Sequence, residues 1–282
     1  MILIADSGST KCDWALISHD SDIRYFSSIG FNPLFHDSEF ITNNLLTHPD
    51  LLNYSASVET IYYYGTSCSS PVKNGIVENG LKNVFVNAKI FVNHDLTGSV
   101  RALCGDEAGI ACILGTGSNC CLFDGEKIIQ NIPSLGFILG DEGSGAWFGK
   151  RLLADYLYRK LPFHLEEEFI ETYSIFKEDI LNSVYKEPGA NVFLASFMPF
   201  LQTHSHNTYV RKLMNEGFSD FFEKHIRAYE DSLYLPVHYV GSVAFHFKEF
   251  LYEVGSKYFL KIGKVIKTPL EGLIGYHLKN HY

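Results

Sequence analysis

The chain contains two stretches in which three short apolar runs follow one another, and this repeated order constrains its fold most. The runs are Ile2–Ala5, Cys12–Ile17 and Ile23–Ser27 in the first stretch, and Gly109–Leu114, Asn119–Phe123 and Lys127–Gln130 in the second. Each run has the length and residue types of a strand, and turn residues separate the runs. We therefore expect two halves that each open with an antiparallel meander.

Helices and further strands are predicted after each opening. The expected strands are Ile61–Tyr64 and Ile90–Val92 in the first half, and Val237–Val240 and Ile262–Ile266 in the second. Helical stretches stand between them, near 38–46 and 72–81, and helices dominate from Asp141 to about Glu230. This alternation is typical of α/β units. A length of 282 residues agrees with two domains, of which the second begins near residue 108.

Acidic residues outnumber basic ones, which limits the possible partners. The chain has 23 Lys and Arg against 32 Asp and Glu, a formal net charge of -9, and no block of five basic residues. We therefore expect no nucleic-acid partner. A bound nucleotide would need local positive potential, supplied by backbone amides, a few cations and a metal ion.

The apolar segments and the cysteines indicate in which cellular compartment the protein is expected. The longest apolar window, 192–201, is ten residues long and is interrupted by Ser196 and Pro199, so we expect no membrane-spanning helix. The first residues read as a strand rather than an export signal, and we expect a cytoplasmic protein. The six cysteines form no C-x-x-C pair, and we expect them to be buried thiols.

The first candidate motif is D-S-G-S-T-K at 6–11, between two apolar runs. A turn with glycine lets backbone amides approach a phosphate, while the hydroxyls and Lys11 add donors and charge. Asp6 has the chemistry to hold the water ligands of Mg²⁺. The same residue types are common in ordinary polar turns, so the motif alone leaves both interpretations open.

The second motif is G-T-G-S-N at 115–119. It nearly matches a dinucleotide-binding fingerprint, but Cys120 replaces the third glycine and a strand follows where a helix is needed. We therefore expect no Rossmann-type NAD site. A nest of amides for a phosphate and a hairpin that needs flexible glycine are equally supported by the residues alone.

The third motif, G-D-E-G-S-G at 140–145, is expected to open a helix that continues to Tyr158. Acidic residues suit the first turn of a helix, but three glycines within six positions are unfavourable there. Close approach of a ligand would explain the glycines and would place Asp141 or Glu142 near Mg²⁺. Capping of the helix is the alternative.

Two further motifs stand where predicted strands end. In N-H-D at 93–95, Asp95 suits the cap of the next helix, a general base, or both, and Asn93 or His94 suits a substrate contact. Gly241 and Ser242 also follow a strand, where a nucleotide base or ribose could pack. Strand-to-helix turns use glycine and serine routinely, so this second motif is weak alone.

Taken together, the five motifs resemble those of the actin, Hsp70 and sugar-kinase fold, and more narrowly the N-acetylglucosamine kinase branch of the BadF/BadG/BcrA/BcrD-type ATPase family. The motifs span residues 6 to 242, and the pair 115–119 and 140–144 is the most specific. The resemblance implies a two-domain actin-like ATPase fold of ribonuclease H-like type, with mixed five-stranded sheets, flanking helices and an interdomain cleft. The implied domains are 1–107, completed by a C-terminal helix at 268–282, and 108–267.

The resemblance also implies a role for each candidate residue. Asp95 would be the base for the 6-hydroxyl of N-acetylglucosamine or a related amino sugar, while Asp6 and Asp141 would hold Mg²⁺ through water. ATP phosphates would contact Gly8, Ser9, Thr10, Lys11, Gly115, Thr116, Gly117 and Ser118, and adenosine would contact Gly241 and Ser242. The sugar would contact Asn32, Gly65, Asn93, Asp95, Asn119 and Asp141. We expect a homodimer that uses ATP and Mg²⁺.

The positions at which this sequence differs from the family affect the identity of the sugar more than the chemistry with ATP. Some members carry a Gly-Trp or Gly-Tyr step where this chain has Gly136 and Phe137, and the second domain is shorter than in the animal enzymes. Two other functions stay open. One is a 2-hydroxyacyl-CoA dehydratase activator, which would need suitably placed exposed cysteines for an iron–sulfur cluster. The other is a sugar or nucleotide sensor without efficient catalysis.

Overall fold

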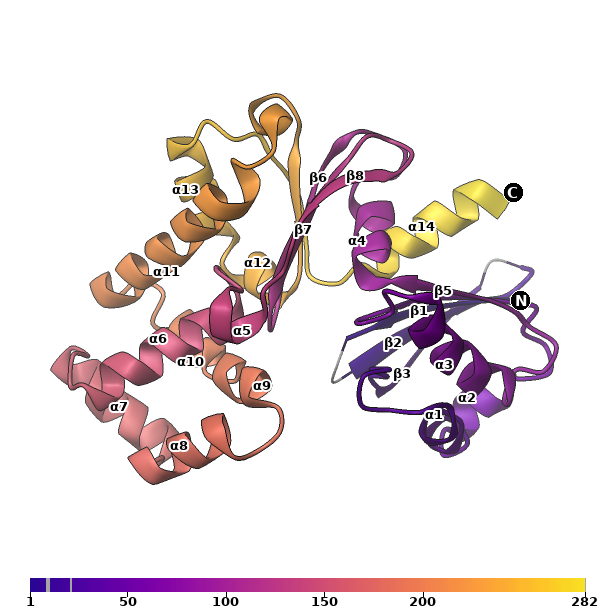
Figure 1. The fold of residues 1–282 in the computed structure, drawn as a ribbon, viewed down its shortest axis with the longest axis horizontal. Coiled ribbons are helices and arrows are strands. Elements are labelled where there is room, and N and C mark those ends of the chain that lie inside the picture. Colours follow the sequence, from indigo (N-terminus) through magenta and orange to yellow (C-terminus); the bar gives the residue numbers. More distant parts are fainter. Residues whose placement is uncertain (9–10, 21, 282) are drawn as a thin grey trace. The chain divides into compact units, whose positions relative to one another are not determined.

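The structure, a computed structural model, describes residues 1–8, 11–20 and 22–281 and divides into two compact units (Figure 1). The first unit joins Met1–Gly105 with Pro269–Tyr282, and the second unit is Asp106–Thr268. Each unit contains a five-stranded sheet and its own helices. In the described part of the chain, no helix is long and apolar enough to cross a membrane.

The sheet of the first unit has the strand order β3-β2-β1-β4-β5. Its strands are β1 (Ile2–Ser7), β2 (Lys11–Ile17), β3 (Ile23–Ile29), β4 (Thr60–Gly65) and β5 (Lys89–His94). β1, β2 and β3 form the predicted antiparallel meander, whereas β4 pairs in parallel with both β1 and β5. The sheet is therefore mixed, as expected.

Helices cover both faces of this sheet (Figure 1). They are α1 (Ser38–Leu45), α2 (Pro49–Leu52), α3 (Pro71–Lys82), α4 (Asp95–Leu103) and α14 (Leu270–His281). Side chains alternate along a strand, so Leu3 and Ala5 share one face, where they join Ile41 of α1 in a buried cluster. On the other face, Nε2 of His277 in α14 lies 2.8 Å from the hydroxyl of Tyr64 in β4.

The sheet of the second unit has the order β10-β9-β6-β7-β8. Its strands are β6 (Gly109–Leu114), β7 (Ser118–Phe123), β8 (Ile128–Ile132), β9 (Val237–Val240) and β10 (Ile262–Ile266). β6, β7 and β8 are antiparallel, and β9 pairs in parallel with β6 and β10. The second predicted meander is thus present, and this sheet is mixed as well.

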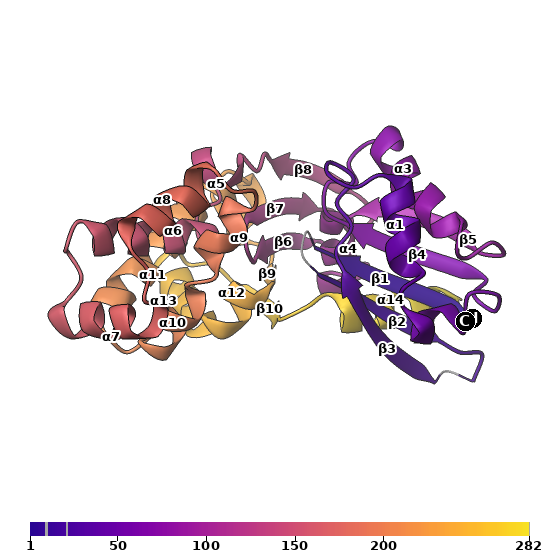
Figure 2. The ribbon, with the colours of Figure 1, turned by 90° about the horizontal axis from the view of Figure 1, so that it is seen from below.

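Most helices of the second unit lie on one side of its sheet (Figure 2). Ile110, Cys112 and Leu114 alternate along β6 and all enter the large buried cluster that these helices share. A π-helical turn (Phe222–Ile226) continues α11, and a 3₁₀ turn (Glu230–Leu233) precedes β9. The helices are α5 (Gly136–Leu139), α6 (Gly145–Leu157), α7 (Phe163–Tyr173), α8 (Lys177–Tyr185), α9 (Ala190–Ala195), α10 (Met198–Thr203), α11 (Thr208–Phe221), α12 (Ser242–His246) and α13 (Lys248–Lys257).

Two helix starts differ from the sequence-based expectation. α6 begins at Gly145, because the hydroxyl of Ser144 accepts the amide N–H of Trp147 at 3.2 Å, so Asp141 lies in the loop before the helix. α4 begins at Asp95 itself, and the cap is His94, whose Nδ1 accepts the amide N–H of Leu96 at 3.1 Å. The prediction for the cysteines is confirmed, since all six are buried and free.

Candidate functional site

The predicted residues of the first unit gather where its parallel strands end. In the pairing register, Ser7 of β1 stands beside Gly65 of β4, and Gly65 stands beside His94 of β5. Asn93 therefore lies one residue inside this edge, and Asp95 follows it directly as the first residue of α4. Ligands of α/β proteins commonly bind at such carboxyl ends. This edge is the first group of candidate site residues.

A glycine-containing segment packs against the turn after β1. A Cβ atom at Gly30 would lie 2.0 Å from the carbonyl oxygen of Gly8, so the two backbones touch and no larger residue fits. The next amide, of Phe31, donates to the hydroxyl of Ser7 at 3.1 Å. Asn32 is buried beside this contact, and its Oδ1 accepts the amide N–H of Leu34 at 3.0 Å. The expected sugar-binding asparagine is thus fixed close to the Gly8 turn.

The turn after β1 is described in part. The amide of Gly8 donates to the carbonyl oxygen of Lys11 at 2.9 Å, which closes the turn. Nζ of Lys11 lies 2.7 Å from Oδ1 of Asp13, and 63% of the lysine side chain is exposed. Ser9 and Thr10, which we expect to contact phosphate, lie outside the described residues. Lys11 is therefore accessible for a polyanion but has a carboxylate partner in this structure.

Three carboxylates give this edge a negative character. Burial, followed by the neighbouring charges of Asp95 and Asp13, raises the pKa of Asp6 to about 7. A carboxylate with such a pKa is stabilised in its charged form by a cation. Among the described residues, no group of three His, Cys, Asp or Glu side chains is placed to hold a metal ion. A carboxylate such as that of Asp6 is a ligand type that Mg²⁺ accepts, directly or through water.

In the second unit, the turn between β6 and β7 has the geometry of an anion-binding turn. The amide of Gly115 donates to the carbonyl of Gly117 at 3.0 Å, and the start of α6 anchors the turn because Ala146 donates to the carbonyl of Thr116 at 3.0 Å. The amides of Thr116 and Gly117 make no backbone–backbone hydrogen bond to the described part of the chain. The buried hydroxyl of Ser118 also has no partner there. These free donors fit phosphate oxygens.

Asp141 lies against this turn. Its Oδ1 accepts the amide N–H of Ser118 at 3.4 Å and the hydroxyl of Ser134 at 3.2 Å. A Cβ atom at Gly117 would lie 3.0 Å from Oδ2 of Asp141, so glycine permits this close approach. Burial raises the pKa of Asp141, although the bonds to Ser118 and Ser134 act in the opposite direction. The predicted phosphate turn and the predicted Mg²⁺ residue are therefore in contact.

The remaining predicted residues of this unit lie around the same turn. Gly241 has a φ of 125°, and a Cβ atom there would lie 2.3 Å from the carbonyl oxygen of Leu114, the last residue of β6. Ser242 follows as the first residue of α12. Oδ1 of Asn119 accepts the amide N–H of Cys120 at 2.9 Å and Nδ2 of Asn131 at 3.0 Å. The segment expected to hold adenosine thus packs on the strand that leads into the turn.

The structure also places Glu142 in a network that the sequence did not reveal. Lys224 and His225, both in the π-helical turn, contact the two oxygens of its carboxylate. Sequence analysis named Glu142 only as an alternative to Asp141 near Mg²⁺. Because the partners lie more than eighty positions away in the chain, no local spacing could have indicated this contact.

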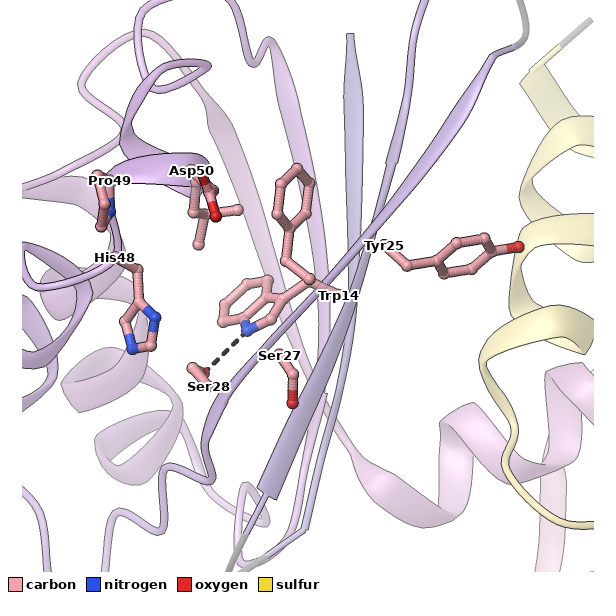
Figure 3. Close-up of a pocket in the computed structure, with 9 residues that line it drawn as sticks. Trp14, Tyr25, Ser27, Ser28, His48, Pro49 and Asp50 are labelled. Carbon is pink, nitrogen blue, oxygen red and sulfur yellow. Dashed lines mark hydrogen bonds between the residues drawn. The ribbon is translucent and has the colours of Figure 1, made fainter.

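One pocket of the first unit is separate from the predicted residues. It has a volume of about 160 Å³ and lies between β3 and the start of α2, with Nε1 of Trp14 donating to the hydroxyl of Ser28 at 2.9 Å in its wall (Figure 3). His48 and Asp50 line it from the α2 side (Figure 3). None of the candidate site residues lines this pocket. It therefore contributes nothing to the site at the strand ends.

Comparison with solved structures identifies proteins with the same fold. A crystal structure from Porphyromonas gingivalis, named a "putative N-acetylglucosamine kinase", is 42% identical to this chain, covers 100% of both chains and has a TM-score of 0.95. One from Chromobacterium violaceum with the same name is 16% identical, covers 98% of both chains and has a TM-score of 0.70. A "putative N-acetylmannosamine kinase" from Listeria monocytogenes is 13% identical, covers 100% of this chain and 99% of its own, and has a TM-score of 0.50.

The three likenesses carry different weight. The first combines high identity with full coverage, whereas the other two are below 25% identity and show likeness of fold alone. Together they confirm the predicted actin-like α/β fold with mixed five-stranded sheets. No protein-family model matches the chain, and no curated protein sequence matches it.

Proposed function

The chain belongs to the N-acetylglucosamine kinase-like proteins of the actin-like sugar-kinase fold, and from this premise we propose that it is an ATP-dependent kinase of N-acetylglucosamine or a related amino sugar. The observation that carries the proposal is the position of Asp95. This carboxylate follows the edge at which Ser7, Gly65 and His94 stand side by side, the place expected for a substrate hydroxyl.

Asp95 acts as the general base in this proposal. It takes the proton of the sugar 6-hydroxyl as that oxygen attacks the γ-phosphorus of ATP, and the bond from the γ-phosphorus to the β–γ bridging oxygen breaks to release ADP. Asn32 and Asn93 would hold the sugar beside it through hydrogen bonds. Asn32 is well suited because Gly30, two residues before it, packs on Gly8, and because the amide of Leu34 orients its Oδ1.

Nucleotide phosphates would be bound by backbone amides. Thr116 and Gly117 offer amides that make no backbone–backbone hydrogen bond to the described residues, and Gly8 and Lys11 offer a second turn in the first unit. Preorganised donors of this kind supply much of the stabilisation in phosphoryl transfer. Bound Mg²⁺ would supply neutralisation of phosphate charge, and Asp6 and Asp141 would hold it through water.

The cysteines favour this function over that of a dehydratase activator. An activator needs cysteines at the surface to hold an iron–sulfur cluster, yet all six cysteines of this chain are buried. The unpartnered hydroxyl of Ser118 in the Gly115–Ser118 turn and the carboxylate of Asp95 also favour catalysis over a purely sensing role. A kinase therefore accounts for more of the site than either alternative.

The experiment that tests the proposal is Mg²⁺-dependent release of ADP from ATP, with and without N-acetylglucosamine. Glucosamine, N-acetylmuramic acid and glucose are run in parallel, and the phosphorylated product is identified by mass spectrometry. We expect strong stimulation by one amino sugar and a sugar phosphate in equal amount to ADP. Hydrolysis that no sugar stimulates, or no turnover at all, would contradict the proposal.

A further inference from the structure

A buried carboxylate with a lysine and a histidine as partners stands next to Asp141. Oε1 of Glu142 lies 2.8 Å from Nζ of Lys224, and its Oε2 lies 3.1 Å from Nε2 of His225. Only 9% of the Glu142 side chain and 7% of the His225 side chain are exposed, against 54% for Lys224. Two consecutive residues of one helical turn therefore bind both oxygens of one buried side chain.

The partners come from an unusual helical segment. Phe222–Ile226 forms a π-helical turn at the end of α11. Such turns are rare and occur frequently at functional sites. Here the turn presents Lys224 and His225 to the same carboxylate. The loop that carries Glu142 also rests on this region, since a Cβ atom at Gly143 would lie 3.1 Å from Cβ of Phe221.

A contribution to folding stability does not by itself explain the contacts of Glu142 with Lys224 and His225. Removing charges from water is costly, and an apolar replacement of a buried ion pair is often as stable as the pair itself. Lys224 and His225 contact the two oxygens of Glu142 at 2.8 and 3.1 Å, so both ends of this carboxylate are fixed. A charged side chain held in one position is suited to fixing the geometry of its neighbours.

The neighbour that needs fixing is Asp141. Its φ of 57° lies in the left-handed region, which is unfavourable for a residue with a Cβ atom. In this conformation its carboxylate reaches the amide of Ser118 and the hydroxyl of Ser134. Relaxation to a negative φ would swing the carboxylate away from the turn. The bonds that Asp141 makes to Ser118 and Ser134 favour this conformation, and a fixed neighbour in the chain would hold the backbone in it further.

We propose that Glu142, whose two carboxylate oxygens contact Lys224 and His225, is the positioning residue that keeps the carboxylate of Asp141 against the Gly115–Ser118 turn. The inference rests on the proposed function, because it assigns Asp141 to the reacting phosphate. Glu142 itself touches neither substrate nor nucleotide. Its effect on the reaction is exerted through residue 141 alone, which makes a distinct kinetic prediction.

The kinetic test is a double-mutant cycle with Glu142→Gln, Asp141→Asn and the double variant, assayed by sugar-dependent ADP release. Glutamine keeps the shape but removes the negative charge that Lys224 and His225 contact. We expect Glu142→Gln to lower kcat about 10-fold with the KM for the sugar changed less than about 2-fold. In the Asp141→Asn background the same substitution should change kcat less than about 2-fold. Multiplicative effects of the two substitutions would overturn the proposal.

Two further variants separate positioning from general destabilisation. Lys224→Met removes one cation from a half-exposed position and should lower kcat in the same direction without preventing folding. Arg211→Met is the matched control, because Arg211 and Glu253 form an exposed ion pair at 2.7 Å elsewhere in the same unit. The control should keep wild-type kcat. An equal loss of kcat in the control would show that any lost ion pair has this effect and would overturn the proposal.

A second measurement does not depend on activity. Hydrogen exchange followed by mass spectrometry reports on the Ser118 amide, which donates to Asp141. We expect faster exchange in the peptide containing 115–118 in Glu142→Gln and no change in Arg211→Met. Unchanged exchange in Glu142→Gln would overturn the positioning role. If the wild-type protein phosphorylates no sugar, the proposed function fails, while this exchange result still decides whether Glu142 holds Asp141.

Discussion

Nδ1 of His94 lies 2.7 Å from Oδ1 of Asp95, and the same nitrogen accepts the amide N–H of Leu96 at 3.1 Å. Nδ1 accepts the amide N–H of Leu96 only when it carries no proton, and it donates to Asp95 only when it carries one. The pKa of His94 is raised, with the hydrogen bond to Asp95 as the largest cause, although burial opposes this. The same nitrogen therefore stands between the cap of α4 and the carboxylate that we assign as the base, and its protonation decides which of the two it bonds.

Replacement of Asp95 by Asn tests that assignment. The amide keeps the shape of the side chain but cannot take the proton of the sugar hydroxyl, so we expect kcat to fall about 10²- to 10⁴-fold. Binding of the sugar, measured by isothermal titration calorimetry, should persist. Asp20→Asn, an exposed position in the same unit, is the control. Wild-type kcat in Asp95→Asn would refute the role of this residue.

Replacement of Gly117 by Asp tests the phosphate turn of the second unit. The new side chain would start 3.0 Å from Oδ2 of Asp141, so two carboxylates would crowd the place where phosphate oxygens are expected. We expect the affinity for ATP to fall at least about 10-fold, as measured by calorimetry. Gly75→Asp introduces the same side chain where no atom lies within 4 Å and should leave ATP affinity intact. Unaltered binding in Gly117→Asp would remove this turn from the nucleotide site.

Replacement of Gly30 by Ala tests the contact between the Asn32 segment and the Gly8 turn. The added methyl group would lie 2.0 Å from the carbonyl oxygen of Gly8, so the two backbones must separate. We expect a loss of about 1–3 kcal/mol in stability, seen as a lower thermal midpoint, together with a higher KM for the sugar. Gly275→Ala, which meets no atom within 4 Å, provides the comparison. Equal midpoints for the two variants would disprove the close approach.

His238 makes the second unit sensitive to acid. Its Nδ1 accepts the amide N–H of Lys264 at 2.9 Å, and burial, followed by the charge of Lys264, lowers its pKa from 6.5 to about 4. Between these two values the unfolded chain binds a proton that the folded chain does not. Stability is therefore fully present above about pH 6.5 and is lost as the pH falls toward 4, by on the order of 2–3 kcal/mol.

The measurement is the thermal midpoint of wild type and His238→Gln between pH 7.5 and pH 4.5. Glutamine cannot be protonated in this range, so we expect the variant to lose less stability on acidification than the wild type. His206→Gln, at an exposed histidine of the same unit, should follow the wild-type curve. Parallel curves for wild type and His238→Gln would show that His238 is not responsible.

The regular strands were readable from the sequence because their information is local. β6 and β10 have the predicted bounds, since each is a short apolar run between turn residues. α5 was not predicted because four residues are too few to show helical periodicity. The start of α6 was misplaced because acidic residues suit a first helical turn, and nothing in the sequence showed that Asp141 has a positive φ.

The candidate catalytic and binding residues could be predicted from the sequence, whereas the contacts that orient them could not. Glycine turns and carboxylates at strand ends are visible as short motifs, so Gly117, Asp95 and Asp141 could be proposed directly. The contacts around them join distant parts of the chain, such as those of Lys224 and His225 in the π-helical turn with Glu142. Such contacts depend on tertiary packing, which local spacing does not encode.

The first unit is built from two separated parts of the chain, and this affects how the protein folds during synthesis. β1 to β5 leave the ribosome early, but α14, which packs against Tyr64, follows only after the whole second unit. The second unit is continuous in sequence and can complete its core before the first. Nascent chains would therefore carry a sheet face that α4 alone covers for most of their synthesis, and chaperones bind apolar surface exposed in this way.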